Sequence, residues 1–230
     1  MTSNELKSQT INVGIDMSVS SPGLCIQKEF HGSEATNKFF YEFSCFAQRN
    51  KDQDIEKKHG NVNLTVFERI PNSKDSYDLN RYKHVINNFM NFLEKHDVDH
   101  NTNIYIENYA FVHPSMAGNS YKLHEITGIL KYLIFQKFDI IANMIPVSSW
   151  KKSICGNGHS TKNEVVKRVR EIVEVDFMKI FGYKIDESDT QQTIKNPVQD
   201  ICDSFCICVN AQKSFQKIIL KKPPKKRQKN

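Results

Sequence analysis

The sequence has no long apolar segment. Its longest apolar run, residues 129–135, is interrupted by Lys131 and falls well short of the roughly 20 residues that a membrane-spanning helix needs. Residues 1–10 are polar and lack the apolar core of a secretory signal. Internal repeats are absent as well. These absences predict a soluble, intracellular protein of the cytoplasm or nucleus.

Cysteine pairs with the short spacing of zinc sites are also missing. The six cysteines stand at positions 25, 45, 155, 202, 206 and 208, and the last three crowd into one predicted helix. We expect them to be small buried side chains of a protein in a reducing compartment. Because cysteine and histidine do not cluster, the sequence predicts no site for a soft metal.

Acidic residues are outnumbered by basic ones, 26 against 32, which gives a net charge of +6. The basic residues gather between positions 151 and 170 and in a tail between positions 221 and 229. Two basic patches favour a polyanionic partner such as nucleic acid, although a solvated surface would have the same composition. The 230 residues suit one sizeable domain. We expect a disordered N-terminus at 1–10, a folded domain over 11–212 and a basic tail at 213–230.

The apolar pattern predicts a mixed domain. Strands are expected at 11–16, at 39–47, 62–70, 104–107 and 140–147, and in a second hairpin strand that begins near Leu24. Periodic apolar stripes predict helices at 79–96, 116–138, 162–175 and 198–212. The polar segments 48–60 and 177–196 are expected to be loops. This order predicts an α/β domain in which an antiparallel meander precedes a parallel half.

Carboxylates end two of the predicted strands and form a pair on the last helix. Asp16 ends the first strand before a Ser/Pro/Gly turn, and Glu107 ends the strand at 104–107. Asp200 and Asp203 share one face of a helix that is apolar nearly all round. Buried like charges this close repel unless a cation neutralises them, so the pattern favours a metal site. The plainer alternative is a turn residue at Asp16 and a solvated surface pair on the helix.

Four segments together resemble a known family. They are Val13-Gly14-Ile15-Asp16 with Gly23, Tyr105-Ile106-Glu107, residues 151–165 around Gly156-Asn157-Gly158, and Asp200-Ile201-Cys202-Asp203-Ser204-Phe205. In this order they resemble the RuvC-type Holliday junction resolvases of the ribonuclease H-like superfamily, over most of residues 11–212. The resemblance implies a ribonuclease H-like mixed sheet, an antiparallel meander plus parallel strands, flanked by helices. It also implies a structure-selective endonuclease that resolves four-way DNA junctions in recombination, replication and repair.

The resemblance assigns roles to individual residues. Catalysis and metal binding fall on Asp16, Glu107, Asp200 and Asp203, with two Mg²⁺ or Mn²⁺ ions as cofactor. Two such ions about 4 Å apart can activate water and stabilise the leaving oxygen, and carboxylate oxygens suit them. DNA contacts fall on Lys151, Lys162, Asn157, Tyr109 and Phe111; the two aromatics flank Ala110, where the family carries its junction-contacting aromatic. The resemblance further implies a homodimer on branched DNA, with no membrane partner.

The chain also departs from the family pattern. Met17-Ser18 stands where the family commonly has Pro-Gly, and residues 48–75 and 176–197 exceed what a minimal bacterial member needs. Both features are similar to viral or phage members. Three other functions fit parts of the sequence: a RuvC-like nuclease for flaps or forks, an actin-like or sugar-kinase-like ATP-binding protein, and a non-catalytic junction-binding protein. The ATP-binding class requires a second phosphate-binding glycine turn, which is missing from the sequence.

Overall fold

The computed structural model describes residues 9–18, 20–30, 38–52, 55–70, 79–108, 117–183, 194 and 196–210, with the backbone alone at 117–119. Tyr109 and Phe111 lie outside the described residues. So do most of the expected N-terminal segment, nearly all of residues 184–195 and the basic tail at 213–230. Among the described residues, no helix has both the length and the apolar character that crossing a membrane requires.

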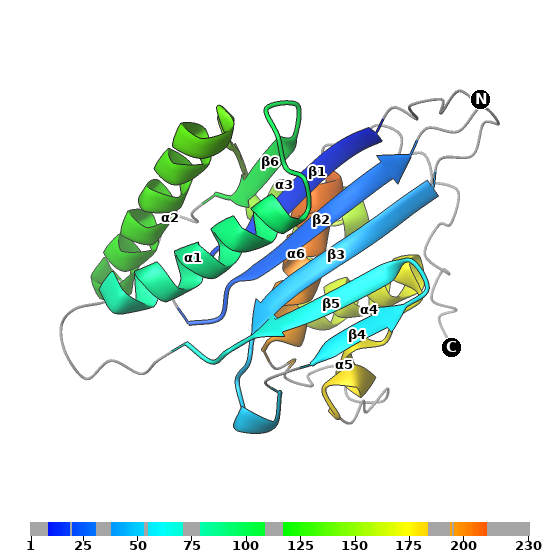
Figure 1. The fold of residues 1–230 in the computed structure, drawn as a ribbon. Helices are drawn as coiled ribbons and strands as arrows, with labels where there is room; N and C mark the ends of the chain where they lie inside the picture. The colour runs from blue at the N-terminus through cyan, green and yellow to red at the C-terminus, as the bar shows by residue number, and fades with distance from the viewer. Residues whose placement is uncertain are drawn as a thin grey trace, which may run out of the picture.

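The described strands form one seven-stranded sheet, in the order β4-β5-β3-β2-β1-β6-β7 (Figure 1). The strands are β1 Gln9–Asp16, β2 Gly23–Phe30, β3 Lys38–Phe46, β4 Glu56–His59, β5 Val62–Phe67, β6 Asn103–Glu107 and β7 Asn143–Ile145. β1, β2 and β3 pair antiparallel, whereas β6 runs parallel to both β1 and β7. The expected mixed sheet, a meander followed by parallel strands, is therefore confirmed.

Several local expectations about the strands and the 48–60 segment were wrong. β5 runs parallel to β3 and does not continue the meander. The expected loop at 48–60 contains β4 and a short 3₁₀ helix, Asn50–Asp52. All four residues of β4 are exposed, so this edge strand pairs with β5 through its backbone and has no apolar alternation to reveal it. β7 has three residues instead of the expected eight: residues 140–142 are not part of the strand, and helix α3 begins at Val147.

Helices cover both faces of the sheet and bury a core on each. They are α1 Leu79–Lys95, α2 Ala117–Phe138, α3 Val147–Cys155, α4 Lys162–Val173, α5 Phe177–Ile180 and α6 Val198–Asn210. α1 and α2 enclose one core with the β1 and β6 side chains that face them. The other core belongs to α3, α4, α5 and α6, and Figure 1 shows α6 behind the strands on that side. The turn α5 lies in a segment that we expected to be a loop.

Cysteines contribute to the α6 core as buried thiols. All six are free, and Cys155 is the least buried of them. The Cys208 thiol donates to the Asn12 backbone carbonyl of β1, with 3.2 Å between Sγ and O. The prediction that the cysteines are structural side chains is confirmed at the level of packing.

Candidate active site

Two neighbouring parallel strands place the first two carboxylates. β1 and β6 are paired so that Ile15 lies opposite Ile106, and each strand ends one residue later. Asp16 and Glu107 therefore leave the same edge of the sheet. Each follows a buried isoleucine, which fixes the strand while the carboxylate lies at its end. The sequence prediction that these two acids occupy matching positions is confirmed by this pairing.

Helix α6 brings the second pair of carboxylates to the same edge because two glycines let it lie directly on the sheet. A Cβ on Gly14 would lie 2.2 Å from the Ser204 carbonyl oxygen, and one on Gly23 would lie 2.3 Å from that of Asp200. Side chains at these two positions would push the helix away. Asp200 is only 5% exposed and Asp203 is partly buried, so they are not a solvated surface pair.

The four carboxylates lie within electrostatic reach of one another. Burial raises the pKa of Asp16 well above its usual value, and the charges of Glu107, Asp203 and Asp200 raise it further. Burial and the charge of Asp203 raise the pKa of Glu107 to about 7. Burial raises the pKa of Asp200 to about 8, with a further contribution from the charge of Asp203. Burial alone raises the pKa of Asp203 to about 6.

The four carboxylates are suitable ligands for a hard divalent cation. Four carboxylates that resist simultaneous ionisation are stabilised by added positive charge, and carboxylate oxygens are the ligands that Mg²⁺ and Mn²⁺ prefer. In the part of the chain that the structure describes, no three His, Cys, Asp or Glu side chains are already arranged as a closed metal site. The chemistry of the four carboxylates, rather than a preformed coordination geometry, is what fits such an ion.

Both predicted lysines lie close enough to influence the carboxylates. The charge of Lys151, on α3, lowers the pKa of Asp203 and Glu107. The charge of Lys162, the first residue of α4, lowers the pKa of Asp16 and Asp200. Lys151 is held by a bond from Nζ to the Ser160 carbonyl oxygen at 3.0 Å. The structure thus brings six of the predicted site residues together.

The capped N-terminus of α4 fixes the position of Lys162. Thr161 is the N-cap, and it forms a reciprocal capping box with Glu164. This arrangement fixes the first turn of the helix, to which Lys162 belongs. Lys162 is exposed, as are Lys167 and Arg170 further along the helix. Arg168 is buried instead and pairs with Glu171, so it does not belong to the exposed basic surface.

Three uncharged donors hold the carboxylates, and sequence reasoning missed all of them. The Ser21 hydroxyl donates to Asp200, and Gln48 Nε2 donates to that hydroxyl at 3.1 Å. Gln199 Nε2 donates to Asp203 Oδ2 at 3.3 Å, and Trp150 Nε1 donates to Glu107 Oε2 at 3.2 Å. Gln199 stands four residues before Asp203 on one helix, a spacing that could have indicated the contact. The sequence contains no comparable signal for Trp150 or Ser21.

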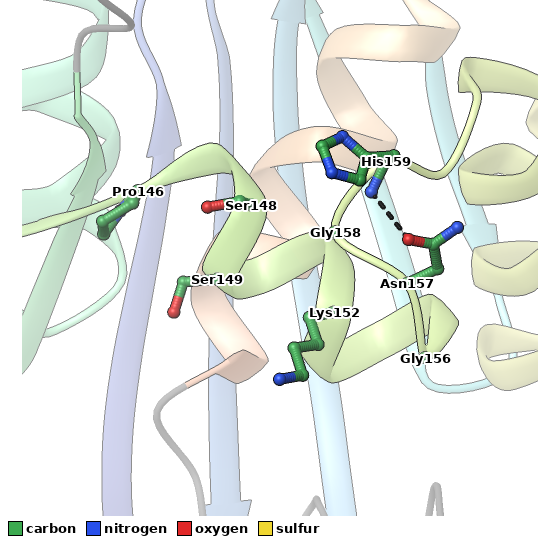
Figure 2. Close-up of a pocket in the computed structure, with 8 residues that line it drawn as sticks. All are labelled: Pro146, Ser148, Ser149, Lys152, Gly156, Asn157, Gly158 and His159. Carbon is green, nitrogen blue, oxygen red and sulfur yellow. Dashed lines mark hydrogen bonds between the residues drawn. The ribbon is translucent and has the colours of Figure 1, made fainter.

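Asn157 lies in the loop that follows α3. The loop folds back on the first turn of α3 and leaves an open depression of about 560 Å³. Figure 2 shows its lining residues: Pro146, Ser148, Ser149, Lys152, Gly156, Asn157, Gly158 and His159. Asn157 Oδ1 accepts from the His159 backbone N–H at 3.0 Å. The four carboxylates are not among the lining residues.

Comparison with known proteins identifies the fold. No protein-family model and no curated protein matches the chain. The structure is similar to that of Thermus thermophilus RuvC, with 16% sequence identity and a TM-score of 0.50 over 88% of this chain and 92% of that chain. It is also similar to T. thermophilus RuvC in complex with a Holliday junction substrate, with 13% identity and a TM-score of 0.52 over 87% and 92% of the two chains. At these identities the likeness is one of fold: the chain has a ribonuclease H-like fold resembling RuvC.

Proposed function

We propose that the protein is a structure-selective endodeoxyribonuclease that hydrolyses phosphodiester bonds in four-way DNA junctions with Mg²⁺ or Mn²⁺. The observation that carries the proposal is the placement of Asp16, Glu107, Asp200 and Asp203 at one edge of the sheet, through the pairing of β1 with β6 and the close approach of α6 to Gly14 and Gly23. A similar fold has been solved with a Holliday junction bound. The expectation of a viral or phage relative stays a prediction.

In this proposal the carboxylates of Asp16, Glu107, Asp200 and Asp203 are the ligands of two divalent ions. Bound there, such ions supply an activated water and stabilise charge on the scissile phosphate and the leaving oxygen. Lys162 and Lys151 add positive charge at the rim of the cluster. Because both already interact with the carboxylates, they lie where a phosphate approaching the site would meet them.

The DNA backbone is proposed to cross α3, the loop with Asn157 and the first turn of α4. Lys152 and His159 are exposed beside the depression of Figure 2, and Lys162 is exposed at the start of α4. Phosphates are bound by cationic side chains and by backbone N–H groups at helix starts. We assign Asn157 to the same backbone contact. Tyr109 and Phe111, two and four residues after Glu107, are proposed to contact the junction.

A homodimer is proposed to form through α2. The apolar stripe of α1 is buried in the core of its own chain, so α1 does not offer such an interface. α2 instead exposes one stripe of large side chains in the described part of the helix. They are Tyr121, 53% exposed, Ile129, 37%, Tyr132, 62%, and Phe135, 50%. Gly128 lies in this stripe with open space around it, so a partner helix could approach closely. A second copy of the chain, paired by two-fold symmetry, matches the symmetry of a four-way junction.

The decisive experiment is incubation of the purified protein with a labelled four-way junction, with and without Mg²⁺. We expect paired nicks that require Mg²⁺ in the wild type and none in Asp16→Asn. Flap, fork and D-loop substrates belong in the same panel, because faster cleavage of one of them would identify the alternative nuclease. Metal-independent binding without any cleavage would indicate a junction-binding protein. Saturable ATP binding would favour the kinase-like class.

A further inference from the structure

Trp150 connects the core to the proposed metal site. It is the only tryptophan of the chain, it is 1% exposed, and its ring packs in the core between the sheet and α6. Its indole N–H donates to Glu107 Oε2 at 3.2 Å. Buried indoles usually find an acceptor, but the acceptor here is a carboxylate of the site itself.

The indole suits the orientation of a metal ligand because it is a neutral donor. The groups that face Glu107 are carboxylates, Asp203 on α6 and Asp16 on β1, and the ammonium of Lys151 on α3. Unlike the ammonium of Lys151, the neutral indole fixes Oε2 without adding a positive charge that would compete with a bound cation. The Trp150 ring is buried in the core, so its N–H fixes the position of Glu107 Oε2 relative to α3. Lys151 Nζ also lies 5.6 Å from the centre of that ring.

We propose that Trp150 is a positioning residue: its indole N–H holds Glu107 as a divalent-cation ligand, and its fluorescence reports cation loading of the site. The inference rests on the metal site of the proposed function, but it does not depend on which DNA is cleaved. Partners that orient metal ligands typically contribute 10- to 100-fold to metal affinity or activity, so the indole should have a measurable effect.

The first test is tryptophan emission, excited at its red edge so that tyrosine does not contribute. Mg²⁺ titration of the wild-type protein should shift the emission saturably, because the charge next to the indole changes when Glu107 binds a cation. Glu107→Gln should abolish the shift. A wild-type emission that does not respond to Mg²⁺, in protein whose melting temperature rises with Mg²⁺, would overturn the proposal.

The second test separates positioning from packing. Trp150→Phe removes the N–H and should raise the Mg²⁺ midpoint, followed by thermal shift and by cleavage, about 10- to 100-fold. High Mg²⁺ should restore the cleavage rate. The matched control is Ile154→Val, which perturbs the same buried face of α3 one turn away. It should lower the melting temperature and leave the Mg²⁺ midpoint unchanged.

The outcomes of the two tests decide between packing and positioning. A folded Trp150→Phe protein with a wild-type Mg²⁺ midpoint would show that the indole only packs, and the proposal would be wrong. If that variant fails to fold, the emission test stands alone. A Mg²⁺-dependent shift in the wild type that is lost in Glu107→Gln supports the proposal, and a wild type without the shift contradicts it. The thermal-shift midpoint needs no DNA. An emission response without junction cleavage would therefore support Trp150 while contradicting the proposed substrate.

Discussion

The carbonyl oxygen of Ser204 on α6 lies 2.2 Å from the place that a Cβ on Gly14 of β1 would occupy. No side chain fits between the two backbones, and this contact sets the height of α6 above the sheet. Gly14→Ala should therefore destabilise the fold by at least about 2 kcal/mol, through overpacking against backbone that cannot rotate away. Urea unfolding of the variant measures the loss.

Gly23→Ala is the informative companion variant. Its Cβ would meet the Asp200 carbonyl oxygen at 2.3 Å, so the substitution displaces the turn that carries a carboxylate. We expect it to lose stability and also to weaken Mg²⁺ binding, as measured by thermal shift. Wild-type unfolding free energies in both alanine variants would mean that α6 does not rest on these glycines.

The metal-free protein should lose stability as the pH rises. The folded-state pKa values of Glu107, Asp203 and Asp200, about 7, 6 and 8, all exceed the ordinary values near 4. Their protonated forms are favoured by folding, so this contribution is fully present below about pH 4 and is lost progressively as the pH rises from about 4 through the folded-state values to about 8. Melting temperatures with a chelator should fall between about pH 5 and about pH 8.5.

Mg²⁺ should reverse that loss at the upper end of the range, because a cation stabilises the ionised carboxylates. The control is Asp200→Asn, which removes one titrating group and should flatten the pH dependence of the melting temperature. A metal-free protein whose melting temperature is highest at about pH 8.5 would contradict the mutual burial of these acids.

Each of the four carboxylates should be essential for cleavage and dispensable for junction binding. Replacing Asp16, Glu107, Asp200 or Asp203 by its amide preserves shape and removes the charge that holds a cation. We expect loss of cleavage in Mg²⁺ and nearly unchanged junction affinity in mobility shifts. Near-wild-type cleavage by Asp200→Asn or Asp203→Asn would remove α6 from the active site.

The strands and helices that carry the acids were predictable because each has a local signal. Val13 and Ile15 alternate with smaller residues before Asp16, and the apolar surround of Asp203 on α6 indicates burial. The edge strand β4 was not predictable, because four exposed polar residues pair only through their backbones. Trp150 was missed for a related reason: its contact with Glu107 joins residues 43 positions apart, and only the tertiary fold brings them together.

The exposed stripe of α2 predicts how the protein associates. Tyr132 is 62% exposed in the middle of this stripe, and an aspartate there would be buried without a partner in a dimer. Tyr132→Asp should convert a dimer into a folded monomer and abolish paired nicking. Light scattering at concentrations that support cleavage measures the mass. Lys83→Asp, at an exposed position of α1, is the matched control and should leave the mass unchanged.

Lys162 and the basic tail are expected to have different roles: Lys162 supports the cleavage step, and the tail binds the DNA backbone. The charge of Lys162 reaches Asp16, Asp200 and Asp203, so Lys162→Ala should slow single-turnover cleavage of saturated junction, about 10²-fold. Lys167→Ala, exposed on the same helix, is the matched control and should leave that rate nearly unchanged. Deleting residues 221–230 should instead weaken binding to all DNAs alike, because phosphate contacts do not depend on base sequence. Each lost contact should lower the slope of log affinity against log salt concentration by about 0.9. If the deletion slows the saturated rate while Lys162→Ala does not, the two basic elements have the opposite roles.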